Sequence, residues 1–254
     1  MTHSFFEKIT FYYFDETDST NDLANLLLKQ NKAENGDVIV TKFQTKGKGQ
    51  SGSNWFSERD KSVLISLICK EINIDISMLT TINMLVSLAL SKTIKIYLQN
   101  ENIKIKWPND IYVNNKKISG ILIESNIIGD TLKNIIIGIG INVNQDNFPD
   151  LLPLACSFYT ISNKKFDTNE ITGVLIDNLN KQLAEIKYFD LEKIKSEYES
   201  QLYGKDESKQ FISNGKSFEG TIKGINKNGQ LEVLVNNNLE IFNNKEIEFV
   251  RSSN

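Results

Sequence analysis

Four β-rich runs follow one another between residues 103 and 143, and they constrain the fold more than any other feature of the chain. These runs are IKIKW (103–107), DIYV (110–113), KISGILIES (117–125) and KNIIIGIGINV (133–143). Short turns rich in Asn, Gly or Lys separate them, and connections this short join antiparallel neighbours because parallel strands need a crossover of a dozen or more residues. The sequence therefore predicts a consecutive, mainly antiparallel sheet.

The flanking segments predict that helices pack on this sheet. DVIVTKF (37–43) and SVLISLICK (62–70) have the composition of strands, and residues 78–98 have apolar positions in a helix-like pattern that predicts a buried helix. Residues 168–202 predict one or two further helices. Ser19-Thr20-Asn21-Asp22 has the pattern of a helix N-terminal capping box. We expect an α+β fold with a mixed, mainly antiparallel sheet packed with helices.

The sequence pattern changes from helical to strand-like near the C-terminus. From about residue 208, short strands broken by turns such as Asn228-Gly229 replace the helical pattern. We therefore place a boundary near residue 205 and predict two domains, a larger one over 1–205 and a small β-barrel-like one over 206–254.

Composition excludes several kinds of chemistry. His3 is the only histidine, so serine, cysteine or zinc sites that need an imidazole in the body of the fold are excluded. Two free cysteines in apolar settings, Cys69 and Cys156, indicate a reducing compartment. No continuous apolar run reaches the roughly 18 residues of a membrane span, and residues 1–20 do not resemble a signal peptide. We expect a cytoplasmic protein, and the net charge of −3 argues against nucleic acid as the main partner.

A glycine- and lysine-rich stretch with no periodicity lies between two predicted strands, from Gln44 to Trp55. Gly47-Lys48-Gly49 combines backbone amides that can turn toward an anion with a cation that can neutralise phosphate. The spacing matches neither a P-loop nor a dinucleotide-binding motif. Taken alone, the stretch is either an anion site or a flexible surface loop.

Three further segments beside apolar strands are candidates for a site. Lys106-Trp107-Pro108-Asn109-Asp110 forms a rigid turn, which is either a hairpin corner or a site. Lys117 lies at the start of an apolar strand. It is either a site residue or a surface lysine whose aliphatic chain packs on the strand while its ammonium group stays in water. Gly138 and Gly140 leave one strand face bare, so something approaches closely there unless a β-bulge explains them.

In this order, these segments resemble the catalytic domain of biotin protein ligases. The resemblance rests on five signals: Asp18-Ser19-Thr20-Asn21, the loop ending at Trp55, the 106–110 turn, Lys117 with Gly120, and GIGINVN (138–144). It implies a class II synthetase-like catalytic domain and a small C-terminal SH3-like barrel. Because the motifs begin almost at Met1, it also implies the monofunctional type, without an N-terminal DNA-binding domain.

The resemblance implies an enzyme, a biotin–[biotin carboxyl carrier protein] ligase of the kind also called biotin–[acetyl-CoA-carboxylase] ligase. In that family, biotin and MgATP give biotinyl-5′-AMP and pyrophosphate, and a lysine of a carboxylase carrier protein or domain then displaces AMP. ATP, biotin and Mg²⁺ are thus the implied small molecules and the carrier domain the implied partner, with no DNA or membrane. Whether the chain forms a homodimer is left open.

The resemblance also implies the roles of particular residues. The implied catalytic residues are Lys117, Lys106 and Asp110, with Asp110 also the candidate Mg²⁺ ligand. The biotin pocket is implied at Ser19, Thr20, Gln44, Gly47, Lys48, Lys117 and Gly120. The nucleotide site is implied at Lys48, Gly49, Gln50, Trp55, Lys106, Asn109 and Asn142.

One departure from the family pattern affects the nucleotide loop. Family members commonly carry Gly-Arg-Gly-Arg followed by further arginine, whereas this chain has Gly47-Lys48-Gly49-Gln50 and then Ser53. A guanidinium that binds phosphate bidentately is absent, so we expect the adenylate to be held by fewer charge-assisted bonds. Two alternatives remain: a lipoate or octanoyl ligase of the same fold, whose glycine-rich motif typically has a histidine, and a non-catalytic biotin-binding sensor.

Overall fold

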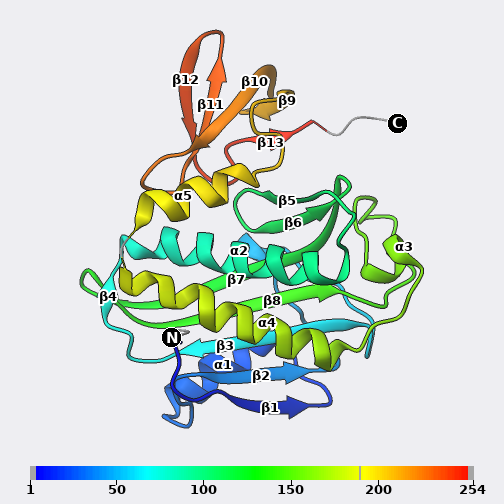
Figure 1. Ribbon diagram of the computed structural model, residues 1–254, viewed down its shortest axis with the longest axis vertical. Helices are drawn as coiled ribbons and strands as arrows, with labels where there is room; N and C mark the ends of the chain where they lie inside the picture. The colour runs from blue at the N-terminus through cyan, green and yellow to red at the C-terminus, as the bar shows by residue number, and fades with distance from the viewer. Residues whose placement is uncertain (1–3, 189, 251–254) are drawn as a thin grey trace.

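The computed structural model describes residues 4–188 and 190–250, so His3 and Arg251 lie outside the described residues. A mixed sheet with the strand order β1-β2-β3-β8-β7-β6-β5 forms the larger part, and β4 pairs with β8 (Figure 1). Only β1 and β2 pair in parallel within this sheet, which confirms the mixed, mainly antiparallel prediction. The strands are β1 (Thr10–Phe14), β2 (Asp37–Thr41), β3 (Ser62–Cys69), β4 (Ile74–Asp75), β5 (Ile103–Lys106), β6 (Asp110–Val113), β7 (Lys116–Ile128) and β8 (Thr131–Asn142).

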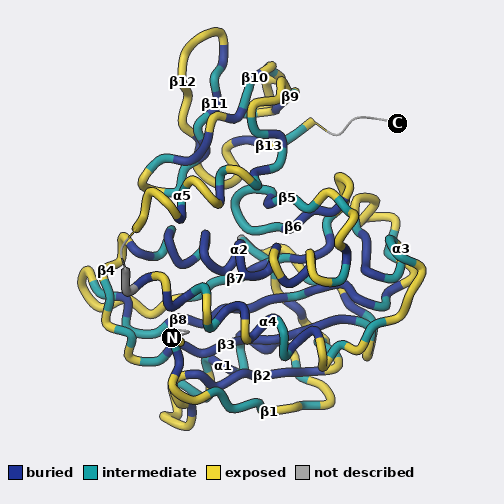
Figure 2. Tube along the Cα trace, viewed as in Figure 1, coloured by how far each residue is buried: buried dark blue, intermediate teal, exposed yellow. Residues whose placement is uncertain are grey.

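Helices cover both faces of this sheet. The main core packs α2 (Met78–Tyr97), α4 (Thr168–Leu183) and α5 (Leu191–Ser200) on one face, whereas α1 (Thr20–Lys29) packs on the other through Ala24. Figure 2 shows β2, β3 and much of α2 as buried, whereas β1 at the edge of the sheet is largely exposed or half-buried. A short helix, α3 (Phe158–Ser162), and the 3₁₀ turns η1 (Gln50–Gly52) and η2 (Ala184–Tyr188) complete the larger part.

Helix α2 is long and apolar enough to cross a membrane by length and composition alone, although no continuous apolar run of that length was expected. However, 67% of its most apolar window is buried inside the protein. It packs against the sheet, α4 and α5 in the main core. These contacts are those of a core helix, as predicted for residues 78–98.

A second, antiparallel sheet follows α5 and has the strand order β12-β11-β10-β9-β13 (Figure 1). Gly229, in the predicted Asn228-Gly229 turn, has φ +77° and donates its N–H to Asn226 O at 2.9 Å. The sheet confirms a C-terminal β domain, and the boundary at residue 205 stays a prediction. Its strands are β9 (Ser208–Ser213), β10 (Lys216–Ile225), β11 (Leu231–Val235), β12 (Asn238–Phe242) and β13 (Glu248–Phe249).

Candidate functional site

A cavity of about 1390 Å³ lies on the sheet beside the N-terminus of α1 and extends to the C-terminal β domain. Sites for one small molecule typically occupy about 300–1,000 Å³. The cavity therefore has room for more than one small ligand.

Glycines on β7 and β8 make the floor of this cavity. Gly120 and Gly140 are paired across the two strands, and Gly138 lies between Leu122 and Ser66 in the next row. A Cβ at Gly138 would lie 2.9 Å from Asn21 Cγ, and one at Gly140 would lie 2.7 Å from Trp55 Cζ2. The expected close approach is therefore confirmed. The bulge alternative is wrong here, because the β7–β8 register shifts only between Asn126 and Ile127.

A register shift between β6 and β7 brings Lys117 to the floor. The pairing passes from Ile111–Ser119 to Tyr112–Lys117, which leaves Ile118 as an extra residue. A bulge of this kind reverses the alternation of side chains, and it places Lys117 on the face of Gly120 rather than on the core face. Lys117 Nζ then lies 2.6 Å from Asp110 Oδ1, and the two side chains are 35% and 21% exposed.

The 106–110 turn is the corner of the β5–β6 hairpin, and it borders the cavity. Lys106 and Asp110 form the last pair of the hairpin before the turn. Lys106 Nζ donates to Tyr112 Oη at 3.0 Å and lies 5.1 Å from the centre of the Phe249 ring. Trp107 Nε1 donates to Gly229 O at 2.8 Å. The turn is therefore a hairpin corner, and it also places Lys106 against the C-terminal domain at the edge of the cavity.

The glycine-rich loop forms another wall. Its ends are joined by a bridge between Lys48 and Asn54, and Trp55 lies over the floor 5.7 Å from Lys117 Nζ. Lys48 Nζ lies 2.5 Å from Asp22 Oδ1 in the first turn of α1, and this bond holds the pKa of Lys48 above its usual value. Trp55 Nε1 is buried and has no hydrogen-bond partner within residues 4–188 and 190–250.

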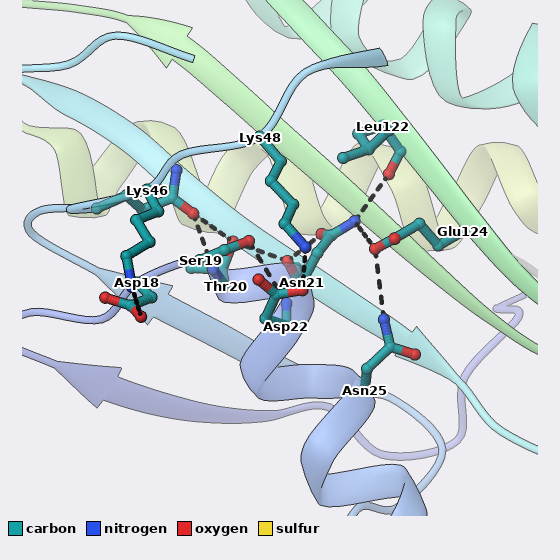
Figure 3. A network of polar contacts seen from close by, with 12 residues as sticks. Asp18, Ser19, Thr20, Asn21, Asp22, Asn25, Lys46, Lys48, Leu122 and Glu124 are labelled. Carbon is teal, nitrogen blue, oxygen red and sulfur yellow. Dashed lines mark hydrogen bonds and ion pairs between the residues drawn. The ribbon is translucent and has the colours of Figure 1, made fainter. Parts of the chain in front are cut away.

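The residues predicted to form a biotin pocket at the start of α1 are joined by hydrogen bonds (Figure 3). Ser19 is the predicted N-cap, and its Oγ accepts from Asp22 N at 3.4 Å, but the Asp22 carboxylate pairs with Lys48 instead of completing the predicted capping box. Gln44 Oε1 accepts from Thr20 N at 2.8 Å and lies 3.1 Å from Thr20 Oγ1. Thus two segments that are far apart in the sequence meet at one end of the cavity.

Most of the predicted site residues line this cavity. They are Ser19, Thr20, Gln44, Lys48, Gly49, Gln50, Trp55, Lys106, Asn109, Asp110, Lys117 and Gly120. Asn109 also fixes the backbone, because its Nδ2 donates to Ile121 O at 2.7 Å.

Two predicted residues are not among those that line the cavity. Gly47 is buried under the end of the loop, where an added Cβ would lie 2.6 Å from Trp55 O. Asn142 is 4% exposed, and its Nδ2 donates to Cys156 O at 3.0 Å. Asn142 Oδ1 is buried and unpaired among the residues described, so its only spare group is an acceptor. The roles of these two residues in ligand binding stay predictions.

Sequence reasoning missed three lysines and an apolar segment of the lining. Lys116, Lys209 and Lys245 line the cavity, the last two from the C-terminal domain. No signal distinguished them among the many lysines of the chain. Leu151, Leu152 and Leu154 also line it, and Leu151 is 88% exposed. Three exposed leucines in one polar loop were a signal that could have been used.

The lining carries more positive than negative charge, although the whole chain has a net charge of −3. Its lysines are Lys48, Lys106, Lys116, Lys117, Lys209 and Lys245, and its carboxylates are Asp110 and Glu248. No cluster of three or more His, Cys, Asp or Glu able to hold a metal occurs in the described part of the chain. Asp110 alone fits Mg²⁺ that arrives on substrate phosphates, since Mg²⁺ commonly takes one or two carboxylates and completes its shell with phosphates and water.

Together, the fold and the site define an α+β protein whose lysine-lined cavity has room for small ligands and a charge that suits an anion. The model of the biotin/lipoate A/B protein ligase family matches residues 13–142. Two similar curated proteins are the bifunctional ligase/repressor BirA of Bacillus spizizenii, 32% identical over 86% of this chain and 67% of that protein, and that of Bacillus subtilis, 30% identical over 93% and 73%.

A similar solved structure is the biotin protein ligase of Aquifex aeolicus in complex with biotin and ATP. It has a TM-score of 0.77 and 26% identity, and the match covers 96% of this chain and 99% of that one. The chain belongs to the biotin/lipoate A/B protein ligase family. The resemblance drawn from the motifs is thereby confirmed.

Proposed function

We propose that this chain is an ATP-dependent biotin protein ligase. It joins biotin to a lysine of the biotin carboxyl carrier protein or domain of a carboxylase, through biotinyl-5′-AMP. The observation that carries the proposal is the Lys117–Asp110 pair on a glycine floor, between a polar pocket at α1 and a lysine-rich wall. The named relatives support biotin as the acid that is activated.

The biotin end of the cavity is the pocket at the start of α1. Thr20 and Gln44 supply polar groups there that suit the ureido ring of biotin. The valerate chain of biotin then runs along the floor toward Lys117.

In the first step, a carboxylate oxygen of biotin attacks the α-phosphorus of ATP, and the bond from that phosphorus to pyrophosphate breaks. Lys117 holds the carboxylate against the phosphate and stabilises the charge that develops as pyrophosphate leaves. Removing one comparable preorganised contact typically lowers the rate by about 10²–10³-fold. A histidine is not required, because no proton is transferred in this displacement.

The nucleotide end is the wall that the two domains share. Lys106, Lys209 and Lys245 supply positive charge for the phosphates, and Trp55 offers a ring face and an unpaired Nε1. Asp110 is the residue that would hold Mg²⁺ brought with ATP, and Mg²⁺ would neutralise charge on the phosphates. We assign 1–205 to the catalytic domain and 206–254 to a β domain that closes this wall.

In the second step, the amine of the carrier lysine attacks the carbonyl carbon of the adenylate, and the bond to AMP breaks. Asp110, beside Lys117, is placed to accept a hydrogen bond from the incoming amine, because it lies on the floor at the point where the anhydride forms.

The test is a transfer assay with the whole chain, ATP, Mg²⁺, biotin and a biotin carboxyl carrier domain, followed by intact-mass measurement of the carrier. We expect one biotinyl group at one lysine, and no modification of a carrier whose target lysine is replaced by arginine. Preferred transfer of lipoate or octanoate would favour the ligase alternative. Biotin binding without any transfer would favour the sensor.

A further inference from the structure

Strand β1 ends the larger sheet, and among the residues that the structure describes no strand lies beyond it (Figure 1). Thr10 N donates to Gly36 O at 3.2 Å, so the backbone groups of Thr10 face the side of β2. Successive residues of a strand direct their N–H and C=O groups to opposite sides. Phe11 and Tyr13 therefore direct theirs away from β2, which leaves a row of donors and acceptors along the outer edge.

The opposite end of the sheet is covered, and β1 is not. At that end, Ile105 N donates to Gln201 O at 2.8 Å and Ile105 O accepts from Tyr203 N at 2.9 Å. Edge strands are commonly protected by lysine, proline or a β-bulge. The β1 sequence, TFYYF, has neither of these residues, and its register with β2 is unbroken. The strand is therefore a template on which another strand can pair.

Both faces of this edge carry exposed aromatic surface. Tyr12 is 42% exposed on one face, and Tyr13 is 63% exposed on the other. The Phe11 and Tyr13 rings are stacked, with their centres 6.1 Å apart and their planes at 18°. A strand that pairs with β1 would add side chains beside these rings and remove them from water.

The sequence of β1 is complementary to itself. When two copies pair antiparallel about Tyr12, Phe11 lies opposite the partner's Tyr13, and these outward-facing residues form the hydrogen-bonded pairs. On the other face, Tyr12 lies opposite its own copy, and Thr10 lies opposite the partner's Phe14. Aromatic residues therefore meet aromatic residues on both faces, and such cross-strand pairs stabilise a sheet.

Charges just beyond the strand favour the same register. Lys8 lies opposite the partner's Glu16, and both are exposed. The Glu16 side chain stays 47% exposed although it pairs with Arg59. Moving the axis one residue toward the N-terminus would place Glu7 opposite the partner's Asp15, which is unfavourable because both are acidic. Moving it the other way would place Asp15 opposite an aromatic ring.

We propose that β1 is the interface of a homodimer, in which the β1 strands of two copies pair antiparallel about a two-fold axis at Tyr12. The two larger sheets then form one continuous sheet, and Phe11 and Tyr13 of both copies form a ladder of four rings. None of the β1 residues is among those that line the cavity, so pairing leaves both cavities open. This inference goes beyond the proposed function and does not depend on it.

The first test is analytical ultracentrifugation of the whole chain from about 1 to about 100 μM, because the fraction of dimer depends on concentration. We expect a reversible dimer of twice the mass of one chain. Tyr12→Lys places two ammonium groups opposite each other at the axis and removes a tyrosine pair, so it should raise the Kd of the dimer about tenfold. Tyr12→Phe keeps the ring and should dimerise as wild type does.

A cysteine variant tests the register. Directly opposite residues of a non-hydrogen-bonded pair have Cα atoms about 4.5 Å apart, a distance that a disulfide can bridge. Tyr12→Cys, oxidised with copper–phenanthroline, should therefore give a covalent dimer. Thr10→Cys is the matched control on the same face, since each introduced thiol then lies opposite the partner's Phe14 and far from the other thiol. Cys69 and Cys156 are buried, so they do not compete.

Three results would overturn the inference. They are a chain that stays monomeric up to about 100 μM, a dimer whose Kd is the same in Tyr12→Lys, and equal cross-linking of Tyr12→Cys and Thr10→Cys. The last two would place the interface at another edge or in another register. None of these results bears on the proposed function, because the measurements need neither biotin nor ATP.

Discussion

Lys117 Nζ and Asp110 Oδ1 are 2.6 Å apart on the floor of the cavity, and each comes from a different strand. The pair exists because the β6–β7 register shifts by one residue at Ile118, which follows Lys117. The position of the main cation of the site is therefore set by backbone pairing and not by a flexible loop. The consequences of this arrangement, and of the contacts around it, can be measured.

Replacement of Lys117 by methionine should lower kcat for adenylate formation by about 10²–10³-fold, because the charge that develops on the phosphates loses its preorganised partner. Single-turnover formation of biotinyl-AMP measures this step. Lys133→Met is the matched control, since Lys133 Nζ donates to Asn73 Oδ1, and neither residue is among those that line the cavity. Equal losses in the two variants would contradict the assigned role.

Gly140→Ala should displace Trp55 from the floor, because the added Cβ would lie 2.7 Å from Trp55 Cζ2. We expect a shift in tryptophan emission and at least a tenfold loss of adenylate formation. Gly173→Ala on α4 is the control, since nothing lies within 4 Å of its added Cβ, and alanine favours a helix. Unchanged emission and activity in Gly140→Ala would show that the position of the Trp55 ring does not depend on this glycine.

Gln50→Arg should slow the dissociation of biotinyl-AMP. Gln50 lines the cavity, and a guanidinium there would add a bidentate, charge-assisted contact to the phosphate that an amide cannot make. A chase experiment with unlabelled biotinyl-AMP gives the off-rate, and we expect a decrease of about tenfold. Gln50→Asn, which adds no charge, controls for the substitution itself. Equal off-rates in wild type and Gln50→Arg would refute the prediction that this chain holds biotinyl-AMP weakly because the loop lacks arginine.

Phe249→Ala should raise KM for ATP more than KM for biotin, because the Phe249 ring lies 5.1 Å from Lys106 Nζ at the nucleotide end. Initial rates of carrier biotinylation give both constants. Leu239→Ala is the control, since Leu239 lies on β12, is 54% exposed and is not among the lining residues. If Phe249→Ala raised both KM values equally, this contact of the C-terminal domain would not favour nucleotide binding over biotin binding.

Both cysteines should be unreactive toward DTNB at pH 8 in the folded protein. Burial raises the pKa of the Cys69 thiol and that of the Cys156 thiol to about 12, so almost no thiolate is present. Two thiols should react after unfolding. Because only the unfolded thiols ionise above their ordinary pKa of 9.0, these groups should lower the free energy of unfolding as the pH rises from 9 toward 12. Rapid labelling of the native protein would contradict this burial.

The order of β5, β6, β7 and β8 was predictable from the sequence, because short turns force neighbouring strands together. Most of the predicted site residues also lie in the cavity, because their motifs follow those turns. The bare faces of Gly138 and Gly140 also gave a correct local prediction, although the sequence did not show that Asn21 and Trp55 fill them. The position of Lys117 could not be predicted by counting alternate residues, since a single unpaired residue, Ile118, reverses which face it occupies.

Long-range contacts were the other limit of sequence reasoning. Nothing near Phe249 or Lys209 indicates that the C-terminal domain meets the 106–110 turn, which depends on packing between segments more than 100 residues apart. Asn142 shows the reverse case, because its motif predicts a ligand contact while its amide nitrogen donates to Cys156 O. A motif thus identifies a residue but not its hydrogen-bond partners.

The most direct test of the central claim is ATP–pyrophosphate exchange by the whole chain, measured with and without biotin. We expect exchange that requires biotin, that lipoate and octanoate do not support, and that falls by about 10²–10³-fold in Lys117→Met. Exchange that proceeds without biotin, or that is faster with lipoate or octanoate, would contradict it.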